Sequence, residues 1–183
     1  MIRNFMLGMA MLVTLQGMVL ACFSQQPAMA NSTAAASANP VVAAFEQIKG
    51  LEGDWEAHLH GTQEGKVMVN TFHVIGEGSA VVHSEWLDGK QLTTTVFYLA
   101  GSELRADHYC DYQNQPRYVL RPSDDTRILA FEMREVTNLE AHPRHFHSTT
   151  WHFVDATHLT QDWQIAENGK EPALVRMAFT RTK

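Results

Sequence analysis

The sequence predicts an all-β protein, a single up-and-down antiparallel β-barrel of about ten strands with a short N-terminal helix. Beyond Gly50 the chain consists of short runs rich in Val, Thr, Phe, Tyr and Trp, separated by turn residues about every eight to twelve positions. Tight-turn pairs such as Asp88-Gly89 and Asn168-Gly169 join neighbouring runs. Since no link is long enough for a crossover helix, we expect a meander that closes on itself and so removes both sheet edges.

The expected elements follow one another along the chain. Asn39-Pro40 combines a helix cap with a proline at the first helical position, so we expect a helix from about Pro40 to Lys49 that ends near Gly50. Ten strand-like runs follow. They lie near Leu51–His60, Lys66–Ile75, Ser79–Leu87, Leu92–Leu99, Glu103–Cys110, Gln115–Arg121, Arg127–Val136, His145–Val154, His158–Ile165 and Ala173–Arg181.

Alternation with a period of two sorts the side chains of each strand into an inward and an outward face. The first strand is the clearest, because its apolar face carries Gly53, Trp55 and Ala57. The same rule predicts the inward residues of three later strands. They are Ala106, His108 and Cys110, then His145, His147, Thr149, Trp151 and Phe153, then Leu159, Gln161, Trp163 and Ile165.

Residues 1–30 have the parts of a secretory signal: a basic start at Arg3, an apolar run from Phe5 to Leu20, and an Ala-Met-Ala cleavage site ending at Ala30. We expect this signal peptide to be removed, which leaves no transmembrane segment and makes the protein periplasmic or secreted. Residues 31–39 are small and polar and are expected to form a disordered leader. Residues 40–183 are expected to form the barrel domain.

A second interpretation of the N-terminus depends on Cys22. Val19, Leu20 and Ala21 before this cysteine make a partial lipoprotein signal, in which Cys22 is lipidated and the protein becomes membrane-anchored. With either signal the expected mature chain is acidic: without residues 1–30 it has 13 basic and 20 acidic residues, a net charge of −7. This charge disfavours nucleic acid and anionic membrane surfaces as partners, because both select a basic face.

Several motifs resemble those of known barrels. Gly53-Asp54-Trp55 looks like the Gly-x-Trp motif that opens the first strand of lipocalins, where the tryptophan closes one barrel end beside a short helix. Other motifs resemble an uncharacterised family of exported bacterial lipocalin-like, calycin-type barrels; these are His108-Tyr109-Cys110, Asn114-Gln115-Pro116, His145-x-His147-Ser148, and Asp155-x-x-His158-Leu159 ending in Trp163. The resemblance covers the mature chain and implies the fold, but this barrel hosts carriers, haem binders and enzymes.

The candidate functional residues are polar or aromatic side chains on inward faces, because small barrels of this strand number enclose one ligand-sized cavity. His108 stands between apolar inward neighbours, and a buried imidazole needs a partner. We therefore expect a binding protein for a small, largely apolar molecule, with ligand-binding residues His108, His147, Thr149, Gln161 and Trp163. Acidic side chains such as Glu85, Asp107 and Glu132 are expected on the solvated outer face.

Other roles remain open for the interior histidines. His108 and His147 are polar residues that fix strand register in one alternative. In another they form a haem or metal site, because two imidazoles together with the Cys110 thiolate suit a soft metal ion. The sequence carries no recognised catalytic motif, so a barrel enzyme with His108 as general base is the weakest hypothesis, and the cofactor stays undetermined.

Overall fold

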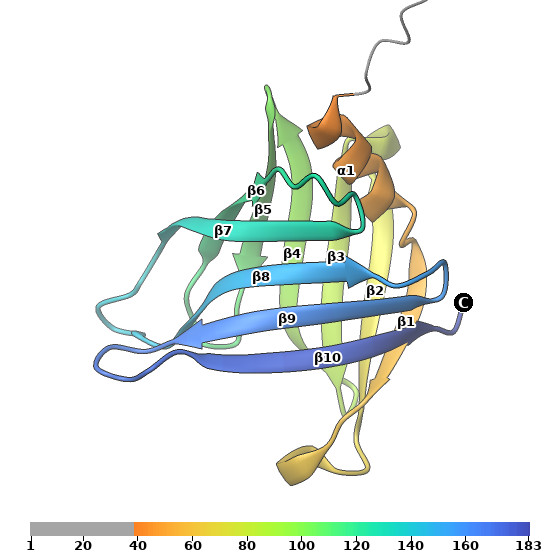
Figure 1. The fold of residues 1–183 in the computed structure, drawn as a ribbon. Helices are drawn as coiled ribbons and strands as arrows, with labels where there is room; N and C mark the ends of the chain where they lie inside the picture. The colour runs from red at the N-terminus through yellow and green to blue at the C-terminus, as the bar shows by residue number, and fades with distance from the viewer. Residues whose placement is uncertain (1–38) are drawn as a thin grey trace, which may run out of the picture. The chain divides into compact units, whose positions relative to one another are not determined.

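The computed structural model describes residues 39–183, which form one helix and a closed antiparallel sheet (Figure 1). Two short 3-10 turns, Gly61–Gln63 and Gly76–Gly78, interrupt the links between strands. The elements are α1 (Pro40–Lys49), β1 (Gly53–His58), β2 (Val67–Ile75), β3 (Ala80–Leu87), β4 (Lys90–Ala100), β5 (Glu103–Tyr109), β6 (Pro116–Arg121), β7 (Ile128–Val136), β8 (His145–Phe153), β9 (His158–Ala166) and β10 (Ala173–Arg181).

Every strand pairs with its neighbours in sequence, and β1 pairs with β10 to close the barrel. The predicted up-and-down barrel of ten strands with a short N-terminal helix is therefore confirmed. The helix has the predicted bounds, and each observed strand overlaps its predicted run. The signal peptide, Cys22 and nearly all of the expected leader lie outside the described residues. Within residues 39–183, no helix has the length and apolar character needed to cross a membrane.

Helix α1 covers one end of the barrel (Figure 1). It begins at Pro40 because the side chain of Asn39 caps it, accepting a hydrogen bond from the backbone N–H of Val41 at 3.0 Å. The helical spacing then places Ala44, Phe45 and Ile48 on the buried side, where they join the core.

Trp55 of β1 is 1% exposed and belongs to the same core cluster as the buried residues of the helix. Its indole Nε1–H donates to the carbonyl of Leu51 at 2.8 Å, and the guanidinium of Arg181 lies 4.4 Å above the centre of its rings. Arg181 also donates hydrogen bonds of 2.6 Å to the carbonyls of Gly50 and Glu52. One side chain of the last strand therefore fixes the tryptophan, the first strand and the segment after the helix together.

The glycine of the Gly-x-Trp motif has a steric reason. Gly53 has φ +123°, a conformation that residues with a side chain rarely adopt. A Cβ atom at this position would lie 2.2 Å from the carbonyl oxygen of Lys183. The close contact between the start of β1 and the backbone of Lys183 therefore requires glycine.

We expect Trp55→Ala to lower the free energy of unfolding by about 3 to 5 kcal/mol, because it empties a large aromatic site that the rest of the core cannot refill. Equilibrium urea unfolding of the two proteins measures this loss. A loss of less than about 1 kcal/mol would show that the closed end does not depend on Trp55.

Candidate functional site

The interior of the barrel carries a set of polar side chains among its aromatic core. All are at most 5% exposed. They come from the inward positions of β2 to β5, β8 and β9, and they are Asn70, His83, Glu85, Thr93, Thr95, His108, Thr149 and Gln161. We call this set the interior polar residues. Because burying a polar group is unfavourable unless it is hydrogen-bonded, the partners of these atoms decide what the interior can do.

Six of the eight interior polar residues have a hydrogen-bond partner inside the barrel for at least one side-chain atom. Thr95 Oγ1 lies 2.8 Å from Nδ1 of His108, and Thr93 Oγ1–H donates to Oε2 of Glu85 at 2.6 Å. These bonds cross directly between paired strands, since Thr95 faces His108 and Glu85 faces Thr93 in the sheet register. Two tryptophan indoles donate to two further interior oxygens, Trp151 to Oγ1 of Thr149 at 3.0 Å and Trp163 to Oε1 of Gln161 at 3.2 Å.

Other interior polar atoms have no hydrogen-bond partner within the described chain. Both amide atoms of Asn70 and both ring nitrogens of His83 are in this group, together with one atom each of three further residues. Those three are Oε1 of Glu85, Nε2 of His108 and Nε2 of Gln161. Native proteins leave few buried polar atoms unpaired, so a concentration inside one barrel is a feature to explain.

Burial changes the protonation of these groups at neutral pH. It lowers the pKa of His83 and of His108 to about 3 each, and for His83 the neighbouring His108 adds to the effect. It raises the pKa of Glu85 to about 7, against the opposing effect of the Thr93 hydrogen bond. The two imidazoles are therefore neutral, whereas Glu85 exchanges its proton near neutral pH.

Aromatic rings fix both histidines. The ring of His83 stacks on Phe72 with centroids 4.4 Å apart, and the edge of Trp151 meets it at 5.4 Å. His108 lies 5.3 Å from Trp163 and 5.5 Å from Phe146. The imidazoles are thus held in place by packing, and a molecule that contacts their free nitrogens would meet preoriented groups.

A groove of ≈ 700 Å³ opens where β1 and β10 diverge. The two strands pair only at Trp55 with Arg181 and at Glu56 with Thr180. Beyond that point the space between them is lined by Glu56, His58, Leu59, His60, Gln63, Met68, Leu87, Val175, Arg176, Met177, Ala178 and Thr180, which we call the β1–β10 groove.

The inner lining of the β1–β10 groove adjoins the partnerless atoms. Met68 and Leu87 face each other in the register of β2 and β3, and the next inward pair along the same strands is Asn70 and Glu85. On the opposite side, Met177 faces Gln161. Neither this groove nor a second hollow of ≈ 270 Å³, between α1 and the link from β6 to β7, is lined by the partnerless residues themselves. Of the two, the groove has lining residues next to them in the sheet register.

Four of the five predicted ligand-binding residues are inside the barrel: His108, Thr149, Gln161 and Trp163 are each at most 3% exposed. The fifth placement was wrong, because His147 is exposed. The sheet register passes from Phe146 opposite Ile165 to Ser148 opposite Gln164, so His147 is the extra residue of a β-bulge. After the bulge Thr149 points inward, as predicted. Before the bulge the inward residue is Phe146, which takes the position that the sequence pattern assigned to His147.

The sequence interpretation missed Asn70, His83 and Glu85. The expected outer-face position of Glu85 was wrong, since this residue is 5% exposed and faces the interior. A signal was present in the sequence, because Val81, His83 and Glu85 alternate on one face of the third run. A charged residue at an inward position is unusual enough that outward exposure was the default expectation.

The proposed metal-ligand trio is not assembled. His147 is exposed on β8, whereas His108 is buried inside, with Nδ1 bonded to Thr95. Nowhere in residues 39–183 do three His, Cys, Asp or Glu side chains gather in a way that would hold a metal ion.

Cys110 forms no disulfide within residues 39–183 and is partly buried directly after β5. Its Sγ accepts a hydrogen bond from the backbone N–H of Tyr112 at 3.3 Å. Burial raises the pKa of the Cys110 thiol to about 12. The thiol therefore stays protonated over the physiological range.

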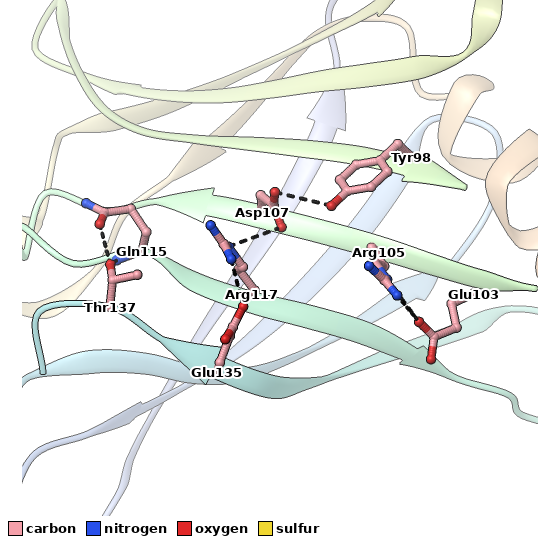
Figure 2. Close-up of polar contacts among 8 residues, drawn as sticks. All are labelled: Tyr98, Glu103, Arg105, Asp107, Gln115, Arg117, Glu135 and Thr137. Carbon is pink, nitrogen blue, oxygen red and sulfur yellow. Dashed lines mark hydrogen bonds and ion pairs between the residues drawn. The ribbon is translucent and has the colours of Figure 1, made fainter. Parts of the chain in front are cut away.

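The outer face of β4 to β7 carries a network of charged side chains (Figure 2). Arg117 bonds to Glu135 at 2.7 Å and lies 4.0 Å from Asp107, and Arg105 and Arg134 both bond to Glu103. Each cation faces a carboxylate, so the network is balanced, and exposed pairs of this kind contribute little to stability. We interpret it as a structural surface.

The turn before β6 is also structural. The side-chain amide of Asn114 donates to the carbonyls of His142 and Arg144, at 2.9 and 2.7 Å. Gln115 accepts a hydrogen bond from the hydroxyl of Thr137 (Figure 2). These contacts join the turn before β6 to the chain between β7 and β8.

The fold is similar to that of other solved proteins. No family model matches the sequence, and no curated protein matches it. Rv2717c from M. tuberculosis has a TM-score of 0.56 and 12% sequence identity, over 76% of this chain and 98% of that one. A protein of unknown function of the DUF3598 family from Nostoc punctiforme PCC 73102 has a TM-score of 0.51 and 14% identity, over 74% of this chain and 49% of that one, about half its length. These similarities support a lipocalin-like barrel and show the fold alone.

We expect Cys110 to react slowly with a thiol reagent in the native protein, because at a pKa of about 12 only about one thiol in ten thousand is ionised at pH 8. Labelling followed with and without denaturant measures the difference. Rapid stoichiometric labelling of the folded protein would contradict the burial of this thiol.

As the pH is lowered, we expect the free energy of unfolding to decrease less steeply for the wild type than for the Glu85→Gln variant. Below pH 6.5 each neutral histidine lowers the free energy of unfolding by about 1.4 kcal/mol per pH unit, since the unfolded state binds the proton more readily. Between pH 7 and 4.5 Glu85 raises the free energy of unfolding as the pH is lowered, because its pKa is higher in the folded state than in the unfolded state. Between pH 6.5 and 4.5, where both effects act, the net slope is therefore about 1.4 kcal/mol per pH unit in the wild type and about 2.8 in the variant.

Urea unfolding at a series of pH values tests this difference. Surface carboxylates contribute equally to both proteins, so the difference between the two curves reports Glu85 alone. Parallel curves between pH 7 and 4.5 would show that Glu85 does not titrate in the interior.

Proposed function

We propose that the protein is an exported binding protein that holds one small, largely apolar ligand with a hydrogen-bonding group inside its barrel. The β1–β10 groove is the access to the interior, and the interior polar residues orient the ligand. The barrel fold is compatible with this role. The aromatic core supplies apolar contact, and the partnerless atoms select the polar part of the ligand.

The partnerless interior atoms are the observation that supports this proposal. A buried donor or acceptor without a partner costs about 1 to 3 kcal/mol, and Asn70 and His83 each contribute two such atoms. A fold that only needed to be stable would gain by replacing them with apolar side chains of similar shape. A bound molecule that supplies the missing hydrogen bonds explains why polar groups occupy these positions.

The position of the groove supports the same proposal. Its volume of ≈ 700 Å³ lies in the range typical of small-molecule sites. Met68, Leu87 and Met177 on its inner side are flexible or half-buried apolar residues, and the partnerless residues lie directly behind or opposite them. A ligand in the groove would place its polar end toward Asn70, Glu85 and Gln161.

Native mass spectrometry of protein taken from its own host tests the proposal. We expect a retained small molecule that is released on unfolding. If the interior holds only water, the spectrum will give the mass of the chain alone, and the wild type will take up no environment-sensitive apolar dye. That pair of results would overturn the proposal.

The exported location is part of the proposal and is supported by the signal-like pattern of residues 1–30. In the soluble form cleavage follows Ala30, and the protein is periplasmic or secreted. In the anchored form Cys22 becomes a lipidated N-terminus. The mass of the mature N-terminal peptide distinguishes the two forms.

We expect His108→Leu to change ligand retention while the barrel still folds. The substitution removes the free Nε2 of His108, and it leaves the hydroxyl of Thr95 without its partner, at a cost of about 1 to 3 kcal/mol. The matched control is His108→Leu combined with Thr95→Val. It removes both partners and should recover most of the stability without restoring retention.

Thermal unfolding and dye uptake, measured on the same samples, separate the two effects. A purely structural histidine gives a different result: retention would recover together with stability in the double variant. That outcome would remove His108 from the binding site.

A further inference from the structure

The buried polar residues of the described chain include one carboxylate, Glu85, and no lysine or arginine. The interior histidines are neutral at physiological pH. Arg181 lies at the closed end, where its guanidinium covers Trp55 and donates to backbone carbonyls. Within residues 39–183 no ion pair involves Glu85. The interior therefore has an acidic group with no cation to balance it.

Glu85 lies one inward position behind the inner lining of the β1–β10 groove. Glu85 is opposite Asn70 in the sheet, and one inward step toward the β1–β10 groove brings Leu87 opposite Met68. Consecutive inward positions along a strand are about 7 Å apart. The head group of a molecule that passes Met68 and Leu87 therefore comes to Glu85 and Asn70.

The acceptors at this point match a cationic donor. Oε1 of Glu85 and Oδ1 of Asn70 have no partner, whereas Oε2 of Glu85 is held by Thr93. An ammonium group has several N–H donors and no acceptor, so it can satisfy both free oxygens at once. A carboxylate would bring a second negative charge beside Glu85, in an interior that offers no basic side chain.

We propose that the ligand carries a protonated amine, which pairs with Glu85 and Asn70 while its apolar body lies along Met68, Leu87 and Met177. This inference rests on the proposed binding function and adds the chemical class of the ligand. It makes the barrel selective for cationic over anionic amphiphiles. Glu85 is the residue that sets this selectivity.

Three fluorescent probes test the inference on the intact protein. Each has a dansyl group on the same short alkyl chain, which ends in a primary amine, a methyl group or a carboxylate. In the wild type we expect the amine probe to bind more tightly than the methyl probe on the order of tenfold or more, as for a charge-assisted hydrogen bond. The carboxylate probe should bind most weakly.

Two substitutions of equal charge separate a local from a general effect. Glu85→Gln keeps the size of the side chain but removes the charge, so it should abolish the preference for the amine. Glu132→Gln removes the same charge from the exposed outer face of β7, so it should leave the preference intact. Equal losses in the two variants would assign the preference to net charge and overturn the inference.

The remaining outcomes distinguish this inference from the function on which it rests. If the methyl probe binds but the amine probe binds no better, the inference is overturned and the binding function stands. If the amine preference survives in Glu85→Gln, Glu85 is not the selective residue and the inference again fails. If no probe binds the wild type and no mass is retained, both proposals are overturned.

Discussion

The contact between Arg181 and Trp55 is the interaction on which the rest of the barrel depends. The two strands that close the sheet share only two residue pairs, so their backbone ladder alone is a weak closure. Arg181 compensates by covering the indole of Trp55 and by bonding to Gly50 and Glu52 in the segment after α1. It also orients the helix that seals this end. Because one end is sealed in this way, the opposite part of the β1 and β10 boundary can remain open.

The interior is divided between two kinds of packing. Phe45 and Ile48 of the helix belong to the apolar core together with Leu104 and Trp55, and Trp55 lies directly opposite Asn70 in the register of β1 and β2. Toward the open groove, neutral imidazoles, amides and one carboxyl group replace aliphatic side chains at inward positions. Such substitutions reduce stability when their atoms lack partners, and proteins accept this kind of cost at functional sites. The interior thus combines an apolar core that maintains the fold with polar groups that are available for recognition.

The sequence predicted the fold well because its signals are local. The cap at Asn39, the tight turns and the alternation of β1 each act over a few residues, and the structure confirms the helix and the ten strands. The site was predicted less well. His147 was misplaced because a β-bulge at that residue breaks the alternation, and no local composition marks it. Glu85 was misassigned because its burial depends on which face of β3 closes the barrel, which is a property of the whole sheet.

The narrow closure of the barrel also has a consequence for how the chain folds. Every other strand pair joins neighbours in sequence, whereas the bond from Arg181 to the carbonyl of Glu52 spans 129 positions. Bringing such distant segments together has the largest loop-closure entropy of any contact in the sheet, and long-range contacts of this kind slow folding. The nine hairpin pairings can form progressively along the chain, so we expect the union of β1 with β10 to be the late and rate-limiting event. An unclosed sheet would leave both of its edges available to other chains, so we expect the nearly complete barrel to be the form with the greatest tendency to aggregate.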